Sequence, residues 1–391
     1  MARKRKPAPR RPIPRTSPAC PLLYAASEGS ADQLYFGRFD APDAYIALGP
    51  HGQRIAVMNA LEYGRALKES EYDTVLRLEE WLQKAREVFH REDVGIAHVV
   101  KLLVREYEVE KYVVPQEFPA GLLTKLRALQ VPVEVSEGPL FPERAIKSKE
   151  EVACIREGCA ASAAGLWAAE KALQRSTARR NGELYLDGES LTSERLRFLV
   201  DVACMENGAL AQYTIVAGGQ QACDPHCRGS GPLRASDLII VDVFPRMTDS
   251  GYFGDMTRTF LKGRASEPQR ALVDSVRRAQ KMAIKKLGPG VTGKTVHEAV
   301  QKYFIGLGYE TRRKPTYHEG FFHGTGHGLG LEVHEPPRVS LTGGRLRNGM
   351  VVTVEPGLYY PGLGGCRIED VGLITDNGVR KISRFPQELE I

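Results

Sequence analysis

Four acidic residues interrupt segments that are otherwise mostly apolar, and this pattern limits what the chain can fold into. The segments are LIIVDVF at 238–244 (Asp242), GYFGDMTRTF at 251–260 (Asp255), MVVTVEPG at 350–357 (Glu355) and GCRIEDVGLIT at 365–375 (Glu369). Runs rich in Val, Ile and Thr predict strands, and an acid inside a buried strand is costly unless it is paired or bound to a cation. The pattern therefore predicts a sheet that carries a polar site.

The spacing of these acids indicates that they face one pocket. Asp255 follows a turn-like TDSG, so its strand can fold back beside the strand of Asp242. Arg367 and Glu369 are two residues apart, so their side chains share one face of a strand. Any single acid could instead pair with Arg258 or Arg367. Four carboxylates in one pocket would raise one another's pKa, so we expect cations there.

A histidine-rich stretch, FFHGTGHGLGLEVHEPP at 321–337, supplies nitrogen ligands. Gly326 and Gly328 flank His327, and we expect them to let the backbone approach a metal or substrate closely. His323 and His334 lie outside this glycine core as candidate donors to a substrate. A phosphate-binding glycine loop is the rival reading, but the prolines that follow break any helix. Four carboxylates and one imidazole favour Mn²⁺, Fe²⁺, Co²⁺ or Zn²⁺, and two ions would balance the charge.

The chain divides near residue 146 into two predicted domains. The first, 19–145, alternates strand-like runs with helical stretches such as 72–89, which predicts a small α/β domain. Its strand-like runs are YIAL at 45–48, RIAVM at 54–58, YVVP at 112–115 and VPVEV at 131–135. The second domain, 146–391, opens with Ser148 and Glu151, a capping-box signature followed by a long helical pattern.

The second domain is predicted to be α+β. Further helices begin at Ser266, with Pro268 in the first turn, and at about Thr292. The acid-bearing strands lie between and after the helices, and Asn377-Gly378 marks a hairpin turn. We expect an antiparallel, strongly curved sheet with helices on one face.

Charge and cysteine content indicate the expected cellular compartment and binding partners. The formal net charge is +6, but a basic, Pro-rich leader at 1–18 carries this excess. We predict that the leader is disordered, with a nucleic-acid-binding arm as the alternative. The leader is also a poor match to a signal peptide. No apolar run is long enough for a transmembrane helix, and seven scattered cysteines fit a reducing compartment, so the cytoplasm is expected. CDPHC at 223–227 lacks the second Cys/His pair of a zinc knuckle.

On these motifs, the second domain resembles the creatinase/methionine aminopeptidase superfamily of metallopeptidases, whose catalytic domain has the pita-bread fold. Within it, the chain resembles the Xaa-Pro peptidases, prolidase and aminopeptidase P. The resemblance covers nearly the whole chain after the leader, and the first domain is similar to the smaller creatinase-like N-terminal domain. It implies two divalent metal ions, with Mn²⁺ first and Co²⁺, Zn²⁺ or Fe²⁺ as alternatives. It implies these five ligands: Asp242, Asp255, His327, Glu355 and Glu369.

The resemblance also implies catalytic roles. A metal-bridging hydroxide would attack the Xaa-Pro carbonyl, and Glu355 would move its proton. His226 and His334 would stabilise the oxyanion or donate to the leaving nitrogen, His323 would lie near the proline, and Arg367 precedes the last ligand by two residues. Two departures stand out: Phe244 occupies a position that is usually Gly, and the interval from Asp242 to Asp255 is longer than usual, so the hairpin between them must bulge or carry a longer turn.

Several functions stay open at this point. The first is a prolidase that prefers Xaa-Pro dipeptides, and the second is an aminopeptidase P that acts on longer peptides. A non-catalytic protein that binds peptide or nucleic acid, or a metal-dependent non-peptidase, is also compatible with the fold. The partners that we expect are a proline-containing substrate and a second copy in a homodimer, with no membrane and no nucleic acid.

Overall fold

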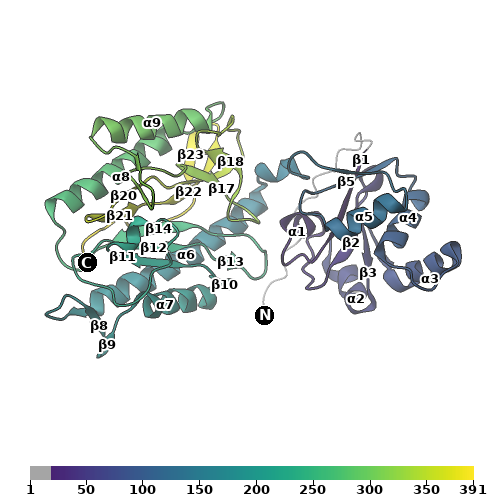
Figure 1. The fold of residues 1–391 in the computed structure, drawn as a ribbon, viewed down its shortest axis with the longest axis horizontal. Coiled ribbons are helices and arrows are strands. Elements are labelled where there is room, and N and C mark those ends of the chain that lie inside the picture. The colour runs from purple at the N-terminus through teal and green to yellow at the C-terminus, as the bar shows by residue number, and fades with distance from the viewer. Residues whose placement is uncertain (1–18) are drawn as a thin grey trace. The chain divides into compact units, whose positions relative to one another are not determined.

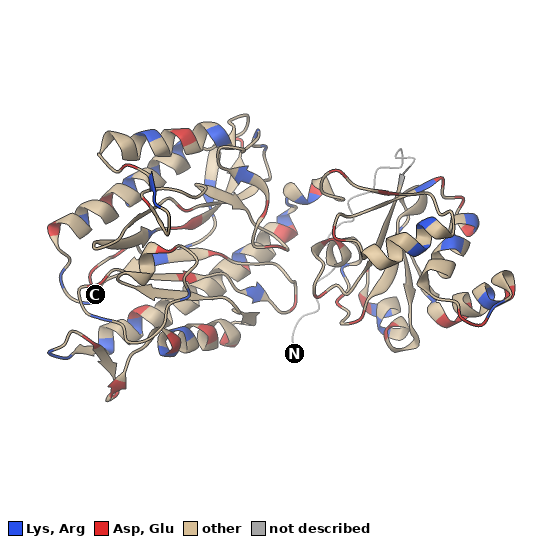
Figure 2. Ribbon diagram, viewed as in Figure 1, with Lys and Arg blue, Asp and Glu red and all other residues tan. Residues whose placement is uncertain are grey.

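The computed structural model describes residues 19–391, and these fall into two compact units that divide after Arg144. The predicted disordered leader, 1–18, lies outside the described residues. Figure 2 shows acidic and basic residues interspersed along the helices of both units. None of the helices in the described part of the chain is long and apolar enough to cross a membrane.

The first unit is a mixed six-stranded sheet with the strand order β4-β3-β2-β1-β5-β6. Its strands are β1 (Ala19–Ala25), β2 (Tyr45–Leu48), β3 (Ile55–Met58), β4 (Thr74–Arg77), β5 (Lys111–Val114) and β6 (Val133–Val135). Its helices are α1 (Ala31–Gly37), α2 (Ala60–Glu69), α3 (Leu78–Phe89), α4 (Ile96–Glu106) and α5 (Ala120–Ala128). Every residue of β2 and β3 is buried, which explains why both strands are apolar throughout. The predicted small α/β domain is confirmed.

One helix prediction in this unit is partly wrong. The stretch 72–89 begins with strand β4, which pairs in parallel with β3, and only Leu78–Phe89 is helical. Thr74 and Val75 are β-branched, and the free edge of β3 offers backbone partners that a helical turn could not use. Tertiary pairing therefore overrides the local helical pattern.

The second unit contains four long helices, two main antiparallel sheets of three and five strands, and four smaller sheets of two or three strands. The helices are α6 (Lys149–Arg175), α7 (Ser193–Glu206), α8 (Glu267–Lys286) and α9 (Gly293–Gly306). In the predicted capping box, the Ser148 hydroxyl accepts from the Glu151 amide at 3.2 Å, while the Glu151 carboxylate accepts from the Ser148 amide at 2.8 Å. Ser266 caps α8 in the same way through Gln269. The predicted helix starts are confirmed.

The predicted curved sheet is built as two ladders. The first is β11 (Ile215–Gly218), β12 (Ile239–Val243) and β14 (Met256–Phe260), in that order. The second has the order β18-β17-β19-β22-β23, from β17 (Gly326–Gly328), β18 (Glu335–Val339), β19 (Val351–Val354), β22 (Asp370–Thr375) and β23 (Gly378–Lys381). The hairpin at Asn377-Gly378 is confirmed, because Thr375 pairs with Gly378 across β22 and β23.

Each sheet buries one face under a pair of helices. In Figure 1 the strands of the two ladders lie between α8 and α9 on one side and α6 and α7 on the other. Val241 and Val243 of β12 belong to the core with α6 and α7, whereas Asp242 between them faces a cavity. Val352 and Val354 of β19 likewise pack with α8 and α9. Because side chains alternate along a strand, the opposite faces are left to form a site.

Candidate active site

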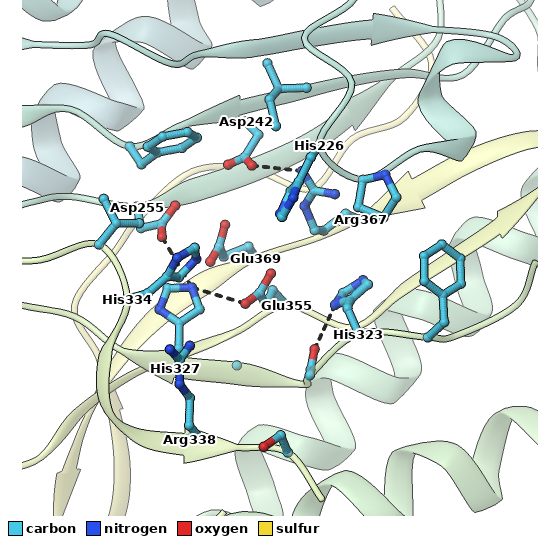
Figure 3. Close-up of a pocket in the computed structure, with 18 of the residues that line it drawn as sticks. His226, Asp242, Asp255, His323, His327, His334, Arg338, Glu355, Arg367 and Glu369 are labelled. Carbon is cyan, nitrogen blue, oxygen red and sulfur yellow. Dashed lines mark hydrogen bonds and ion pairs between the residues drawn. The ribbon is translucent and has the colours of Figure 1, made fainter. Parts of the chain in front are cut away.

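A cavity of about 630 Å³ lies in the second unit, and the predicted site residues line it. All nine are present: His226, Asp242, Asp255, His323, His327, His334, Glu355, Arg367 and Glu369. Figure 3 shows Asp255, His327, Glu355 and Glu369 pointing toward one another, with Asp242 and Arg367 beside them. The structure therefore brings these side chains together in one cavity.

The first sheet delivers Asp242 and Asp255. Asp242 lies in β12 opposite Thr257 of the antiparallel neighbour β14, and Asp255 directly precedes β14. Their side chains are 8% and 3% exposed. The fold-back that was predicted from the TDSG turn is confirmed.

The second sheet and a short hairpin deliver the remaining predicted ligands. His327 is the middle residue of β17, and Glu355 directly follows β19. The segment 365–375, which was predicted as a single strand, is divided into β21 (Gly364–Arg367) and β22. Glu369 lies in the break, because β21 pairs with β20 (Gly357–Tyr360) while β22 pairs with β19.

The glycines beside His327 serve sheet packing. A Cβ atom at Gly326 would lie 2.0 Å from the Thr353 carbonyl oxygen, and one at Gly328 would lie 2.3 Å from that of Pro336. We expected these glycines to admit a metal or substrate. At both positions the backbone of a neighbouring segment occupies the space of a side chain, so the glycines allow β17 to carry His327 between two close partners. Gly326 also lines the cavity.

The carboxylate and imidazole groups have the chemistry of a metal site. Asp255, His327 and Glu369 each offer one ligand atom, and these atoms lie within 4.8 Å of one another. The Oε1 atom of Glu369 is buried and has no hydrogen-bond partner among the described residues. A buried carboxylate oxygen without a donor is costly, and a cation would satisfy it. These residues therefore fit a bound divalent metal.

Thr257 adds a further indication of missing positive charge. Its hydroxyl oxygen lies 2.8 Å from Oδ1 of Asp242 and 2.8 Å from Oε2 of Glu369. A hydroxyl has one hydrogen and can donate it to only one of these carboxylates at a time. Asp242 also accepts from the Arg367 guanidinium at 2.8 Å, so Glu369 is the acid that a metal would serve.

The pKa shifts follow from burial and mutual repulsion. Burial, then the charges of Glu369, Asp242 and Glu355, raise the pKa of Asp255 well above its usual range. Burial, then the charges of Glu355 and Asp242, raise the pKa of Glu369 to about 8. Burial also acts to raise the pKa of Glu355, but the hydrogen bond and charge of His327 outweigh it, and the pKa falls to about 2. Two of the acids thus resist ionisation without a cation.

His327 is held by its acidic neighbours. Its Nε2 lies 3.2 Å from Glu355 Oε1 and 3.7 Å from Asp255 Oδ2. Burial acts to lower its pKa, but the hydrogen bond and the charge of Glu355 raise it overall. The Nδ1 atom lies 3.1 Å from the Gly328 carbonyl oxygen. This contact orients the ring so that Nε2 faces the carboxylates.

Arg367 connects the metal-site acids to a tyrosine that was not predicted from the sequence. Its Nη2 donates to Asp242 Oδ2 at 2.8 Å, and its Nη1 donates to the Tyr359 hydroxyl at 3.0 Å. The Tyr359 oxygen is also 2.9 Å from His323 Nε2. Since His323 Nδ1 lies 2.8 Å from the Gly324 carbonyl oxygen, that nitrogen is the donor and Nε2 accepts from Tyr359.

The three non-ligand histidines have different settings. Both nitrogens of His323 are engaged, and burial lowers its pKa to about 4. The His334 ring lies 4.4 Å from that of His327 and nearly perpendicular to it. Desolvation and then the charge of His327 lower the pKa of His334 to about 4, although the residue is partly exposed. His226 lines the cavity from an exposed turn whose Asp224 carboxylate accepts its backbone amide.

The two departures from the resemblance have visible structural results. Phe244 is half-buried and lines the cavity, two residues beyond Asp242. The interval before Asp255 contains strand β13 (Arg246–Met247), which pairs with β10 (Ala209–Leu210). This pairing lies outside the ligand positions.

The cysteines form no competing site. No disulfide joins any of the seven, and Cys223 is buried. Within residues 19–391 the search for clustered metal-ligand atoms finds Asp255, His327 and Glu369 and does not include Cys223, His226 or Cys227.

Comparisons with known proteins agree with this geometry. The model of metallopeptidase family M24 matches residues 153–376. A Xaa-Pro dipeptidase of Pyrococcus furiosus is 33% identical over 248 residues, which are 63% of this chain and 65% of that protein. A Xaa-Pro dipeptidase of Pyrococcus horikoshii is also 33% identical, over 63% of this chain and 64% of that protein. The chain thus matches slightly less than two thirds of the length of these relatives.

Solved structures extend the likeness to the whole fold. The prolidase of Pyrococcus horikoshii superposes with a TM-score of 0.76 at 26% identity, covering 95% of each chain. An X-Pro aminopeptidase of Thermotoga maritima has a TM-score of 0.78 at 22% identity, covering 95% of this chain and 97% of that one. The predicted pita-bread fold with a smaller N-terminal α/β domain is confirmed.

Proposed function

We propose, from the premise that the chain belongs to metallopeptidase family M24, that it hydrolyses the Xaa-Pro bond and prefers dipeptides. The names of the two Pyrococcus relatives support this substrate class. A tertiary Xaa-Pro amide has no N–H, which removes a donor that many peptidases use. A site that recognises the substrate through charged groups does not need this N–H and can therefore act on the Xaa-Pro bond.

We further propose that the ligands of two divalent ions, Mn²⁺ first, are these residues: Asp242, Asp255, His327, Glu355 and Glu369. The orphan Oε1 atom of Glu369 and the raised pKa of Asp255 support the need for positive charge. When bound, the ions would activate a water molecule and polarise the substrate carbonyl. Co²⁺, Zn²⁺ and Fe²⁺ suit the same donors.

The chain's own groups would handle protons and orientation. Glu355, whose pKa is lowered to about 2, is an ionised acceptor for a proton at its carboxylate. His226 and His334 line the cavity with exposed side chains and would donate to the developing oxyanion or to the leaving nitrogen. Arg367 would hold Asp242, and His323 with Tyr359 would form a neutral wall near the proline ring.

Arg338 carries the preference for dipeptides. Its side chain is exposed and lines the cavity, and no ion pair joins it to any residue of 19–391. Figure 3 shows Arg338 next to His327, on the side away from Asp242. An unpaired guanidinium in a cavity is suited to a carboxylate, and a dipeptide carries one directly on its proline. An aminopeptidase P, which the Thermotoga neighbour's name suggests, would accept a longer chain there.

The test compares Ala-Pro, Ala-Pro amide and Ala-Pro-Ala with metal-stripped enzyme that is refilled with Mn²⁺. We expect kcat/KM for Ala-Pro to exceed that for the amide by about tenfold to a hundredfold, because the amide lacks the carboxylate charge. Arg338→Met should remove this difference. Arg345→Met, at an exposed residue outside the cavity, is the matched control. Faster turnover of the tripeptide, with no effect of Arg338→Met, would identify an aminopeptidase P instead.

A further inference from the structure

An apolar wall stands beside the metal-ligand candidates and has no role in the chemistry described so far. It consists of Ile215 of β11 and Phe244, the residue that follows β12, and both line the cavity. Ile215 pairs directly with Asp242 across the antiparallel ladder. Phe244 is two residues beyond Asp242, so the alternation of the strand places all three side chains on one face. We refer to Ile215 and Phe244 as the apolar wall.

The ring of Phe244 remains accessible from the cavity. Phe244 is half-buried, whereas Val243 and Pro245 on either side are buried. Its backbone is not in the left-handed region, so the position accepts any residue without strain. An apolar ring that faces a cavity is available for a ligand, because covering it removes more apolar surface from water.

The proposed binding direction sets which part of a substrate meets the wall. Arg338, the partner for the prolyl carboxylate, lies on the opposite side of His327 and Glu355 from Asp242 in Figure 3. The scissile bond has to lie at the carboxylate and imidazole cluster between them. The residue before proline then extends toward Asp242, and its side chain meets the face that carries the apolar wall.

We propose that Ile215 and Phe244 determine specificity for the residue before proline, and that they favour a large apolar side chain such as Leu or Phe. This inference rests on the proposed Xaa-Pro peptidase function. Glycine at that position would leave the wall exposed to water. An acidic side chain would lose hydration against the wall without gaining a polar partner there, and Asp224, an exposed acid that also lines the cavity, would repel it.

The experiment measures kcat/KM for Leu-Pro, Gly-Pro and Asp-Pro with the full chain saturated with Mn²⁺. For the unaltered protein we expect Leu-Pro to exceed Gly-Pro by about tenfold or more, and Asp-Pro to be the poorest. Phe244→Ala should reduce the ratio of Leu-Pro to Gly-Pro to about threefold or less. Phe244→Leu, which keeps an apolar side chain, should keep most of the ratio and also serves if the alanine variant does not fold.

Phe198→Ala is the matched control, because Phe198 is 66% exposed on α7 and does not line the cavity. It should leave the substrate ratio unchanged. The inference is overturned if Phe244→Ala hydrolyses all three dipeptides in the same proportions as the unaltered protein. It is also overturned if Gly-Pro is the best substrate of that protein. Failure of the unaltered protein to hydrolyse any Xaa-Pro dipeptide would instead refute the proposed function on which the inference rests.

Discussion

Tyr359→Phe is a perturbation whose cost can be worked out from named contacts. The Tyr359 side chain is fully buried, and its hydroxyl accepts from Arg367 at 3.0 Å and donates to His323 at 2.9 Å. Phenylalanine keeps the ring and its apolar packing and removes a single oxygen. The change therefore deletes two hydrogen bonds without creating a large cavity.

The cost is dominated by Arg367, whose guanidinium is 3% exposed. A buried donor that loses its partner costs about 1–3 kcal/mol, toward the upper end for a charged group. The His323 nitrogen that loses its donor adds to this, so we expect a loss of about 2–4 kcal/mol. For a unit of this size that corresponds to a fall in Tm of about 4–16 °C. The pKa of His323 should rise, because its neutral form loses the hydrogen bond from Tyr359.

The assay is thermal unfolding at a fixed excess of Mn²⁺, with the His323 titration followed by NMR on protein loaded with diamagnetic Zn²⁺. Tyr360→Phe is the matched control, since that hydroxyl donates to the Glu310 carbonyl oxygen at 2.9 Å at an exposed site. We expect the control to cost less than about 1 kcal/mol. Equal destabilisation of the two variants, together with an unmoved His323 pKa, would show that the Arg367–Tyr359–His323 contacts do not stabilise the site.

Three further outcomes follow from the buried charges. Removal of metal with a chelator should lower Tm, and Mn²⁺ should restore it. At a hundredfold excess over Kd, the ion should raise the free energy of unfolding by about 2.7 kcal/mol. In the metal-free protein, the raised pKa of Glu369 means that the folded state holds a proton more tightly than the unfolded state. Urea unfolding should therefore show that stability falls as pH rises from about 5 through 8. Constant stability over that range would contradict this. Lys147→Met should cost about 3–5 kcal/mol by urea titration, because it removes the ammonium group that pairs with buried Glu335. Lys294→Met, at an exposed pair with Glu298, should cost less than about 1 kcal/mol. Equal costs would refute this.

The charged part of the site could be predicted from the sequence because charge is conspicuous in buried strands. Asp242 lies within a run of Val and Ile, and Glu355 directly follows a Val-rich run. An acid that is buried at such a place destabilises the fold unless it has a partner. The period of two along a strand also put Arg367 and Glu369 on one side, and both line the cavity, although Glu369 lies in the break after β21. These inferences need only local spacing, so they hold without knowledge of the register between strands.

Features that depend on long-range pairing could not be predicted. The strand Thr74–Arg77 exists because β3 offers an edge in parallel, and the gap between β21 and β22 exists because they pair with different neighbours. The close approach of the Thr353 and Pro336 backbones to Gly326 and Gly328 was likewise not foreseen from the sequence. In each case, a segment distant in sequence supplies the physical reason.

The neutral hydroxyls of the site show where sequence inference ends. Thr257 bridges Asp242 and Glu369, the latter 112 residues away, and Tyr359 bridges His323 and Arg367. Threonine and tyrosine are ordinary strand residues, so their presence in β14 and β20 incurs no penalty that would mark them. An acid in the same place demands a partner, but a hydroxyl only gains one when the register supplies it. The charged ligands of such a site can therefore be inferred from local sequence, whereas the neutral groups that orient them are identified only in the folded structure.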